Sequence, residues 1–345
     1  MDKVFLTKDE VIEISEKIKN VKVCFIGDIC LDLYWRADMK RSKLSRETPH
    51  YPLPIVDETY APGGGGNVMN NIHALGIKKL VSISAIGSDW RGFLLTDWLK
   101  KNNISADNII YREHGVTPCY IKPLRMGISD VVYEDPRLDF ENYESLSVDD
   151  EKKILEALDS AVKEVDIIAV SDQLLCGIIT EKIRERLCEI AKNIPVVVDS
   201  RDRISEYSGV IVKPNEVEAA TATGRDISVI DISFVEAENI AKELQSKNKA
   251  PVIVTLGALG SLWCDNNECL IAPTVKANPP VDFVGAGDTF LSAFCCAYAA
   301  CKNGSKALAY ANLASGVTVK KIGTTGTATT DEILKKWEEN YEHTT

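Results

Sequence analysis

The chain has no long apolar run. Among its 345 residues, no uninterrupted stretch reaches the ~18 apolar residues that a membrane-spanning helix requires. Residues 1–10 also have no apolar core of the kind that a signal peptide carries. These absences argue against the membrane and secreted classes of protein, so we expect a cytoplasmic protein that makes no membrane contact.

Positive charge is also scarce. The sequence has 40 lysine and arginine residues against 51 aspartate and glutamate residues, which gives a formal net charge of −11. A nucleic-acid surface needs clustered basic residues, so we expect no nucleic-acid partner. The 45% hydrophobic and 26% charged residues are ordinary for a globular protein, and the length allows one large α/β domain or two smaller ones.

Metal-binding patterns are missing. The four histidines are scattered and form neither an H-E-x-x-H motif nor a zinc spacing, and the ten cysteines include no C-x-x-C pair. We therefore predict that no structural zinc site is present. Most of the cysteines lie in apolar runs, and we interpret them as buried, reduced thiols.

The common nucleotide and catalytic motifs are missing as well. There is no G-x-x-x-x-G-K-[ST] loop, and no G-x-G-x-x-G follows the first predicted strand. Neither a G-x-S-x-G elbow nor an H-R-D motif occurs. These absences exclude a P-loop, a dinucleotide fingerprint and a protein-kinase site, and they disfavour a nucleotidyltransferase or methyltransferase.

The sequence does contain a regular alternation of short β-branched runs and amphipathic segments. This alternation predicts an α/β fold, in which a mostly parallel, doubly wound sheet forms the middle of three layers with helices on both faces. The predicted strands are 21–27, 81–87, 109–111, 166–170, 195–199, 210–212 and 252–255, with a hairpin at 261–264 and 269–272. The predicted helices are 9–20, 67–75, 89–102, 148–164, 178–192, 215–223, 232–246, 286–301 and 305–320.

Residues 33–60 interrupt the alternation. We predict short strands at 34–36 and 53–56, separated by a basic, polar segment, and two more strands at 117–125 and 130–135. These strands would form a small second sheet. We expect residues 1–345 to be a single domain that carries this sheet as a lid, built from segments 33–60 and 113–136.

A glycine-bounded turn opens the apolar helix predicted at 286–301. Gly285, Ala286 and Gly287 precede Asp288 there. The N–H groups at a helix N-terminus bind anions, and glycine lets phosphate oxygens approach the main chain. Asp288 adds a proton acceptor, so the turn has what phosphoryl transfer to a hydroxyl needs. The alternative is that Asp288 only caps the helix.

Polar residues also follow several predicted strands. Asp28, Asp172, Asp199, residues 213–218 and residues 255–260 all do so. In a doubly wound sheet these positions gather at the edge where ligands bind, although each residue alone is as consistent with a turn or a cap. The glycine run 63–66 before Asn67 fits close contact with a polyhydroxylated ligand. Alternatively, it is a flexible loop before a helix that Asn67 caps.

Two of these segments carry a family resemblance. Gly63-Gly64 with Asn67, and residues 281–289 with Asp282 and Gly285–Thr289, resemble the two signatures of the ribokinase (PfkB) family of carbohydrate kinases. The resemblance covers residues 20 to 335. Within the family the chain is most similar to the kinases of D-glycero-D-manno-heptose 7-phosphate, through residues 27–35, 137–141, 171–172, 213–218 and 311–324.

The resemblance implies an ATP-dependent, ribokinase-like sugar kinase. Asp288 would take the proton of the attacking hydroxyl, and the N–H groups of Gly285, Ala286 and Gly287 would form an anion hole. Asn215 and Glu218 would hold Mg²⁺ through water, and Asp282 could bind a monovalent cation such as K⁺. The residues implied for nucleotide binding are Lys213, Asn215, Thr255, Gly257, Gly260, Asn312, Gly316 and Gly323. Those implied for the sugar are Asp28, Asp32, Gly63, Gly64, Asn67, Arg137 and Asp172.

Three further expectations concern the site and its surroundings. We expect Asp288 to have an ordinary pKa near 4 and to be ionised at pH 7. A phosphorylated acceptor would need a cluster of cations, for which the candidates are Lys122, Arg125, Arg137 and Arg201. We expect the lid to close on the sugar and to pair two subunits as a homodimer through Tyr34, Trp35 and Ile55, unless these side chains cap the sugar instead.

Several residues expected near the acceptor differ from the pattern of the heptose 7-phosphate kinases. Heptose 7-phosphate kinases usually carry Asp-Pro-Lys where this chain has Asp199-Ser200-Arg201, and residues 171–177 lack their aromatic residue and lysine. The alternatives are a kinase of another sugar or of a nucleoside, or a catalytically silent sugar- or nucleotide-binding protein. The intact segment Gly285–Asp288 argues against the silent protein. We expect no nucleotidylyltransferase domain of the kind that bifunctional relatives carry.

Overall fold

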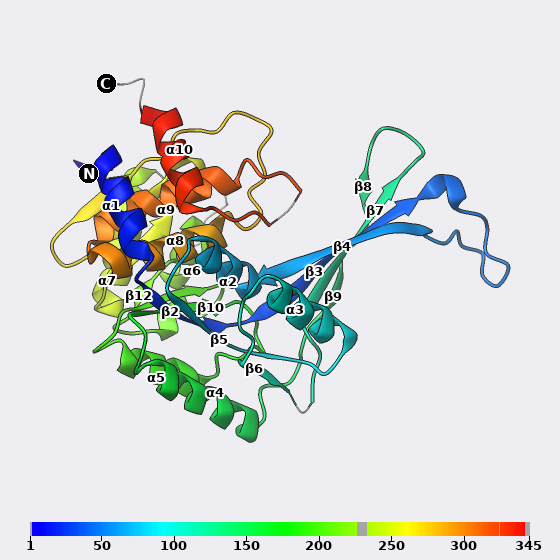
Figure 1. Ribbon diagram of the computed structural model, residues 1–345, viewed down its shortest axis with the longest axis horizontal. Coiled ribbons are helices and arrows are strands. Elements are labelled where there is room, and N and C mark those ends of the chain that lie inside the picture. The colour runs from blue at the N-terminus through cyan, green and yellow to red at the C-terminus, as the bar shows by residue number, and fades with distance from the viewer. Residues whose placement is uncertain (1, 113, 226–232, 324, 342–345) are drawn as a thin grey trace.

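The structure is a computed structural model that describes residues 2–112, 114–225, 233–323 and 325–341. Position 113 of the second lid segment and position 232 of the helix predicted at 232–246 lie outside this description. Within the described residues the chain forms one sheet of ten strands and one of five (Figure 1). The expected fold class, a large mostly parallel sheet with a smaller second sheet, is confirmed.

The large sheet has the strand order β1-β15-β14-β13-β12-β11-β10-β2-β5-β6. From β13 to β6 all neighbouring strands are parallel, and β14 and β15 add an antiparallel hairpin at the other edge. The two-residue strand β1, which the sequence pattern does not reveal, pairs with β15. The bounds are β1 (Asp2–Lys3), β2 (Lys22–Gly27), β5 (Lys79–Ile86), β6 (Asn108–Tyr111), β10 (Ile167–Asp172), β11 (Val196–Ser200), β12 (Ile211–Val212), β13 (Val252–Thr255), β14 (Ser261–Cys264) and β15 (Cys269–Ala272).

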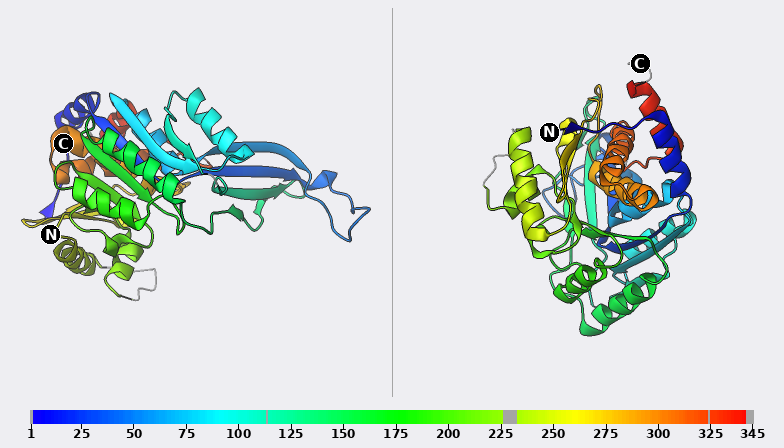
Figure 2. Two further views of the ribbon diagram at one scale, coloured as in Figure 1. Left: turned by 90° about the horizontal axis from the view of Figure 1, so that it is seen from below. Right: turned by 90° about the vertical axis from the view of Figure 1, so that its left-hand side faces the viewer.

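Helices cover both faces of this sheet because its strands are apolar on both. Along β2, Val23 and Phe25 face one core, whereas Cys24 and Ile26 face the other. Helices α8 and α9 pack into the first core and α7 into the second, as the right-hand view of Figure 2 shows. The bounds are α1 (Lys8–Ile18), α2 (Gly65–Ala74), α3 (Trp90–Lys101), α4 (Val148–Ala161), α5 (Glu181–Ile190), α6 (Glu216–Ala222), α7 (Phe234–Asn248), α8 (Ala286–Cys301), α9 (Gly304–Thr318) and α10 (Thr330–Tyr341), with 3₁₀ turns at Met39–Arg41, Ile204–Glu206 and Gly257–Leu259.

The small sheet projects from one end of the large one (Figure 1). Its order is β4-β3-β7-β8, with β9 also paired to β7, and its bounds are β3 (Ile29–Asp38), β4 (Ile55–Gly64), β7 (Cys119–Met126), β8 (Tyr133–Glu134) and β9 (Leu138–Phe140). β3 and β4 have ten residues each, so the strands predicted at 34–36 and 53–56 were too short. β9 lies outside both predicted lid segments.

The glycine run is not a loop. Gly63 and Gly64 end β4, and Gly65 begins α2 with Gly64 as its N-cap at a φ of 53°. A Cβ at Gly65 would lie 2.3 Å from Cζ of Phe25, so this glycine is needed for close packing on the large sheet. Asn67 lies inside the helix, so the alternative of a flexible loop before a helix that Asn67 caps is wrong.

One cysteine prediction is also wrong. Cys264 and Cys269 form a disulfide between the neighbouring strands β14 and β15, while eight other cysteines are free. The two residues are direct partners in the antiparallel register, and their Cα atoms are 4.2 Å apart. Strand pairing brings the two sulfurs together, which the five-residue separation alone does not predict.

Candidate active site

Two cavities meet at the carboxyl-terminal edge of the large sheet. The first has a volume of about 370 Å³ and lies between the ends of β11 and β13 and the start of α8. The second, of about 330 Å³, lies between β3, the segment after β10 and the loop before α8. Gln173 and Asp288 line both cavities. Asp288 therefore lies where the contents of the two cavities would touch.

The start of α8 presents backbone N–H groups to the first cavity. Gly285 has a φ of 78°, which side chains disfavour, and a Cβ there would lie 2.6 Å from Asn67 Nδ2. The N–H of Ala286 donates to the carbonyl of Phe283 at 3.2 Å. In the part of the chain that the structure describes, the N–H groups of Gly285 and Gly287 donate no hydrogen bond. Two of the three predicted N–H groups are thus available to an anion, and that of Ala286 is not.

A chain of buried side chains holds the Asp288 carboxylate. Asn67 Nδ2 donates to Asp288 Oδ2 at 2.9 Å, and Asn71 Nδ2 donates to Asn67 Oδ1 at 3.1 Å. Thr289 Oγ1 donates to Asn71 Oδ1 at 3.1 Å. Because Asn67 Oδ1 accepts from Asn71, Nδ2 is the atom of Asn67 that faces the Asp288 carboxylate. Asn71 is not among the residues predicted above, although two asparagines one turn apart on an apolar helix are a usable signal.

The pKa of Asp288 is far from its ordinary value. Burial raises it from 3.8 to about 7; the hydrogen bond from Asn67 and the charge of Lys213 oppose this rise, and the charge of Asp199 adds to it. The expectation of a pKa near 4 is therefore wrong. A motif reveals the residue type, but the enclosure that shifts its pKa comes from helix packing around the turn.

Lys213 projects a buried ammonium group into the first cavity. Its side chain is only 4% exposed, and its Nζ lies 3.0 Å from Asp199 Oδ2. Burial alone would lower the pKa of Lys213, but the charges of Asp199 and Glu218 outweigh it, and the pKa is raised. Lys213 therefore stays charged at neutral pH. A Cβ at Gly287 would lie 3.9 Å from its Nζ, so the positive charge is next to the start of α8.

Asn215 and Glu218 begin α6 as a capping box. Asn215 Oδ1 accepts hydrogen bonds from the N–H groups of Val217 and Glu218, and Glu218 Oε2 accepts one from the N–H of Asn215 at 2.8 Å. Both side chains also line the first cavity, together with Asp199. Burial raises the pKa of Glu218, and the charge of Asp199 adds to the rise. Such oxygen donors suit a Mg²⁺ ion that keeps most of its water ligands.

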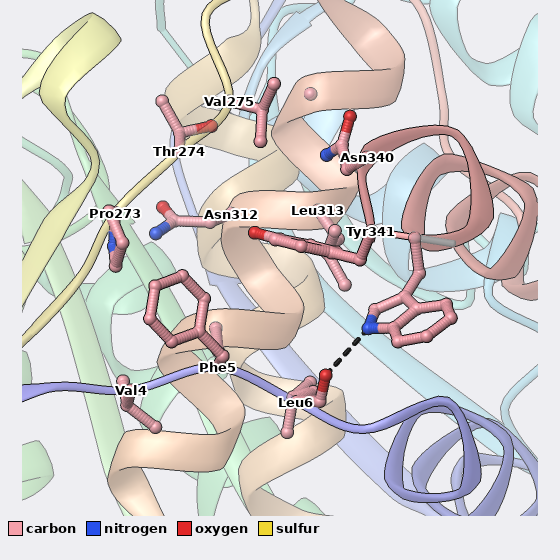
Figure 3. Close-up of a pocket in the computed structure, with 13 residues that line it drawn as sticks. Val4, Phe5, Leu6, Pro273, Thr274, Val275, Asn312, Leu313, Asn340 and Tyr341 are labelled. Atoms are coloured by element: carbon pink, nitrogen blue, oxygen red, sulfur yellow. Dashed lines mark hydrogen bonds between the residues drawn. The ribbon is translucent and has the colours of Figure 1, made fainter. Parts of the chain in front are cut away.

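The remaining residues predicted for the nucleotide divide into two groups. Gly316 lines a cleft of about 10 Å³ between α9, α10 and residues 4–6, a cleft to which Asn312 also contributes (Figure 3). Gly323 lines neither large cavity. The residues that do line the first cavity are Thr255, Gly257, Gly260 and Asn312.

Asp282 ties the turn before α8 to the segment after α9. Its Oδ1 accepts from the N–H of Val284 at 3.0 Å, and its Oδ2 accepts from the N–H of Gly323 at 2.9 Å. Across the described ranges, no group of three or more histidine, cysteine, aspartate or glutamate side chains is arranged to hold a metal ion. Both carboxylate oxygens of Asp282 thus accept backbone hydrogen bonds and anchor the loop.

The second cavity combines an acid with several cations. Asp32 extends from β3 toward β4, where a Cβ at Gly63 would lie 2.5 Å from its Oδ2. Burial raises the pKa of Asp32, while the charges of Lys122 and Arg137 oppose the rise. Lys122, Arg137 and Arg201 all line this cavity with Asp32. The cavity is therefore suited to a ligand that presents both hydroxyl groups and negative charge.

Three of the four candidate cations, Lys122, Arg137 and Arg201, line the second cavity. Arg125 does not line the second cavity; it pairs with Asp135 in the small sheet. Arg137 pairs with Asp139 at 2.6 Å and stacks on the ring of Tyr120. Strand alternation explains the difference, because Lys122 and Arg125 are three residues apart on β7 and so point to opposite faces of the sheet.

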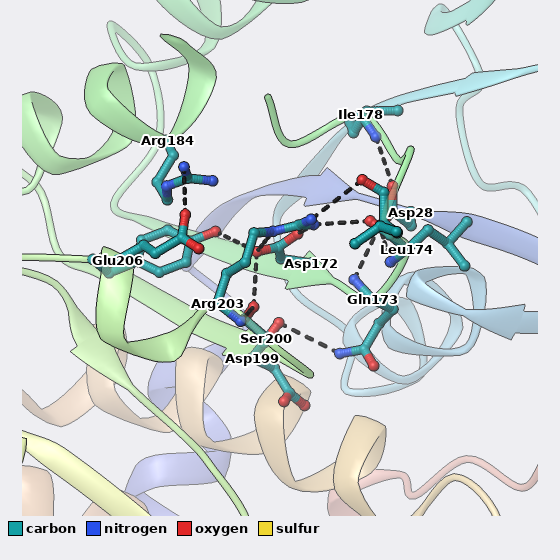
Figure 4. A network of polar contacts seen from close by, with 12 residues as sticks. Asp28, Asp172, Gln173, Leu174, Ile178, Arg184, Asp199, Ser200, Arg203 and Glu206 are labelled. Atoms are coloured by element: carbon teal, nitrogen blue, oxygen red, sulfur yellow. Dashed lines mark hydrogen bonds and ion pairs between the residues drawn. The ribbon is translucent and has the colours of Figure 1, made fainter. Parts of the chain in front are cut away.

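Two predicted acids are held by protein groups. Asp28 is 4% exposed, and its carboxylate accepts three backbone hydrogen bonds, although it lies at the edge of the second cavity. Asp172 lines neither cavity; it pairs with Arg203 and accepts hydrogen bonds from Ser200 and Tyr207 (Figure 4). The prediction that Asp172 contacts the ligand is therefore not supported, because its carboxylate is directed into this network.

The close approach of Gly63 to Asp32 leads to a stability prediction. A Cβ at Gly63 would lie 2.5 Å from Asp32 Oδ2 and 2.8 Å from Cys30 Sγ. Gly63→Ala is expected to lower the free energy of unfolding by about 1–3 kcal/mol, as overpacking generally does. Gly316→Ala is the control, since its Cβ would meet only the flexible Lys336 side chain at 3.4 Å. Urea unfolding measures both, and equal stability of the two variants would contradict the prediction.

No helix in the described part of the chain is long and apolar enough to cross a membrane.

Comparison with known proteins gives a family match over most of the sequence. The profile of the pfkB family carbohydrate kinases matches residues 21–331. Several curated relatives have the name bifunctional protein HldE, and two of them serve as examples. The relative from a Nitratiruptor species is 32% identical over 90% of this chain, and that from Sulfurimonas denitrificans is 34% identical over 88%. The chain spans 64% and 61% of the lengths of these two relatives.

Solved structures agree on the fold. Ribokinase of Arabidopsis thaliana, complexed with ribose and ATP, superposes with a TM-score of 0.66 at 19% identity and covers 92% of this chain and 99% of its own. Phosphofructokinase-2 of Escherichia coli, in complex with fructose-6-phosphate, gives a TM-score of 0.68 at 20% identity, with 93% and 99% covered. At such identities these likenesses establish the fold and nothing finer.

Proposed function

Because the chain belongs to the pfkB family of carbohydrate kinases, we propose that it transfers the γ-phosphoryl group of ATP to a hydroxyl group of a sugar phosphate. The enzyme class follows from the family: it is a phosphotransferase that acts on a sugar alcohol group. One observation carries the assignment of the two substrates. The two cavities meet at Asp288, so a nucleotide in the first and a sugar in the second would have their reacting ends beside one carboxylate.

The residues around Asp288 support an in-line transfer. Asp288 would accept the proton of the attacking hydroxyl, with Asn67 holding its other oxygen. The free N–H groups of Gly285 and Gly287 would bind the oxygens of the transferred phosphoryl group, and Lys213 would balance their charge. Mg²⁺, held through water by Asn215 and Glu218, would neutralise the nucleotide phosphates.

The charge of the second cavity supports a phosphorylated acceptor. Lys122, Arg137 and Arg201 line it, and arginine binds phosphate through two parallel hydrogen bonds. The resemblance to the heptose 7-phosphate kinases and the identity to HldE proteins support a heptose 7-phosphate as the leading acceptor. The second candidate is another sugar or a nucleoside, favoured by Ser200 and Arg201 standing where those kinases have proline and lysine. A silent binding protein remains the third.

A coupled ADP-release assay tests the function. The assay would use Mg-ATP with a panel of heptose and hexose phosphates, the corresponding free sugars and several nucleosides. We expect turnover with one or more sugar phosphates and much lower kcat/KM with the matching free sugars. Turnover of a free sugar or nucleoside alone would favour the second candidate. ATP binding without turnover of any acceptor would favour the silent protein.

The raised pKa of Asp288 leads to a prediction on pH. Since only the ionised carboxylate can accept a proton, kcat/KM is expected to fall about tenfold for each pH unit below a midpoint near 7. A pH–rate profile from pH 5.5 to 9 measures this midpoint. Glu218, whose pKa is also raised, is the competing group that lines the first cavity, so the midpoint should persist in Glu218→Gln. A flat profile between pH 6 and 8 would contradict the assignment.

We also propose that the small sheet acts as a lid, that two subunits pair through it, and that a monovalent cation binds near Asp282. The small sheet would close over the bound sugar, and slower hydrogen exchange of segments 33–60 and 114–136 with acceptor present would support this. Ile55 is 41% exposed and could contribute to a dimer interface with Tyr34 and Trp35, which light scattering would test. A K⁺ ion near Asp282 would make turnover depend on K⁺, so the assay should be repeated with Na⁺ in its place.

A further inference from the structure

The segment after β10 reaches the junction of the two cavities. Its first residue, Gln173, shares with Asp288 the property of lining both. The side-chain amide of Gln173 donates to the backbone carbonyl of Asp199 at 3.4 Å, which leaves its carbonyl oxygen and second N–H for a ligand. A neutral amide at this point can contact a sugar hydroxyl or a phosphoryl oxygen without charge repulsion. Leu174, the next residue, lines the second cavity and not the first, so the segment that carries Gln173 lies on the acceptor side of the junction.

The backbone of this segment is held on one side by Asp28. Asp28 Oδ2 accepts from the N–H groups of Gln173 and Leu174 at 2.9 and 2.8 Å, and its Oδ1 accepts from the N–H of Ile178 at 2.7 Å (Figure 4). A Cβ at Gly177 would lie 2.2 Å from Asp28 Oδ1, so the segment wraps closely around this carboxylate. All three bonds join a charged acceptor to backbone donors, the stronger kind of hydrogen bond.

The same segment is held on the other side by Arg203. Its guanidinium group donates to the carbonyls of Leu174 at 2.8 Å and Leu175 at 3.3 Å, and it pairs with Asp172 (Figure 4). Asp172 in turn accepts a hydrogen bond from Tyr207 at 2.9 Å. Arg203 lines neither cavity. Arg203 therefore acts on the reaction through the groups that it binds, which are the Asp172 carboxylate and the two backbone carbonyls.

We propose that Arg203, with Asp28 opposite it, is a positioning residue that fixes Gln173 at the cavity junction and thereby sets the affinity for the acceptor. The proposal rests on the proposed function, because it concerns the acceptor side of that site. The N–H groups of the segment bind Asp28 and its carbonyls bind Arg203, so the backbone has fixed partners on both sides. Losing Arg203 leaves the carbonyl of Leu175 without this partner and that of Leu174 with the N–H of Gly177 alone, while Arg112 still holds Cys176. The part of the segment next to Gln173 is then held mainly through its N–H groups, and Gln173 samples several positions.

Variants of Arg203 give the sharpest test, since Asp28 also borders the acceptor cavity. Arg203→Lys keeps the charge beside Asp172, but a single ammonium cannot reach the carboxylate and two carbonyls together. The double variant Arg203→Met with Asp172→Asn removes both charges and leaves no unpaired buried ion. Arg186→Lys is the matched control, because this arginine lies on the outer helix α5 and pairs with Asp159.

The kinetic arm separates positioning from general destabilisation. We expect the acceptor KM to rise about tenfold in both Arg203 variants, with the ATP KM within about twofold of the parent, since charge-assisted hydrogen bonds on the acceptor side are lost. The control should match the parent. An unchanged acceptor KM would overturn the proposal. An equal rise of the acceptor KM and the ATP KM, together with a lowered melting temperature, would also overturn it, because general destabilisation would then explain the effect.

The second arm needs no turnover. Hydrogen exchange of the amides in residues 173–178 is expected to quicken about tenfold in the Arg203 variants, while exchange in α5 stays unchanged. Unchanged exchange in 173–178 would overturn the proposal. If no acceptor is turned over by the parent enzyme, the proposed function fails, and the exchange result still decides whether Arg203 holds the segment.

Discussion

Asp288→Asn is expected to lower kcat by about 10²- to 10⁴-fold, the usual contribution of a general base. Asparagine has the shape of aspartate and can still contact Asn67, but it cannot accept the hydroxyl proton. ATP affinity should be unchanged or higher, because the variant removes a negative charge from the wall of the phosphate cavity. Single-turnover kinetics and calorimetric titration of ATP measure the two quantities separately.

The thermal stability of Asp288→Asn serves as a control for the loss of its kcat. Because the folded pKa of Asp288 is about 7 against 3.8 for the free side chain, the folded protein holds this proton more tightly than the unfolded chain. The carboxyl thus favours folding below about pH 4, and this contribution is lost as the pH rises to 7. At pH 8 the asparagine variant should unfold at the same temperature as the parent or higher. Near-normal kcat in such a well-folded variant would remove Asp288 from the role of base.

Arg201→Ala is expected to raise the KM of a phosphorylated acceptor by about 10- to 100-fold, because a charge-assisted contact contributes about 1.5–3 kcal/mol. Arg201 lines the acceptor cavity, and within the described chain its guanidinium group has no acidic partner that would compete with a phosphate. Lys122 and Arg137, by contrast, already contact Tyr34 and Asp139. Arg201 is therefore the cation most available to a phosphate on the acceptor.

The same variant should be compared on acceptors with and without the phosphate. If Arg201 binds this phosphate, Arg201→Ala changes the KM of the free sugar little, because the group that the arginine contacts is already missing. The effects of removing the arginine and of removing the phosphate are then not additive. Arg125→Ala is the matched control, because Arg125 lies on the same small sheet and pairs with Asp135 outside the cavity. Equal losses on both acceptors, or an equal effect of Arg125→Ala, would contradict the assignment.

The large sheet could be predicted from the sequence because its strands are buried on both faces. Runs such as Val196–Val198 and Val252–Val254 are apolar at every position, so their pattern needs no knowledge of the neighbours. The strands of the small sheet are different. The middle of β3, residues 34–36, is only half-buried and polar in part, and its length is determined by pairing with β4 and β7. Long-range pairing of this kind leaves little local signal.

The residues of the site also fall into those that a local sequence pattern reveals and those that only long-range contacts define. The glycines before α8 and Asp288 could be identified, because a turn and an anion site each require particular residue types close together in the chain. Arg203 could not be identified from such a local pattern, and the only local signal for Asn71 is its spacing from Asn67 on an apolar helix. Asn71 meets Thr289, 218 positions away, and Arg203 acts on carbonyl groups 28 and 29 positions before it. Backbone carbonyls have no sequence signature, so a residue that binds them resembles any other arginine.

The passage of the chain between the two sheets has a consequence for recombining family members. β2 continues into β3 through Asp28, and β4 continues into α2 at Gly64 and Gly65. The two crossings lie side by side, since the N–H of Gly65 donates to the carbonyl of Asp28 at 2.8 Å. A chimaera that exchanges the hairpin of β3 and β4 would therefore have adjacent breakpoints, whose mutual hydrogen bond must be transplanted as a pair. Such an exchange would carry Asp32 into a new host while leaving Asp288 behind, which separates one side of the acceptor cavity from the chemistry as an exchangeable module.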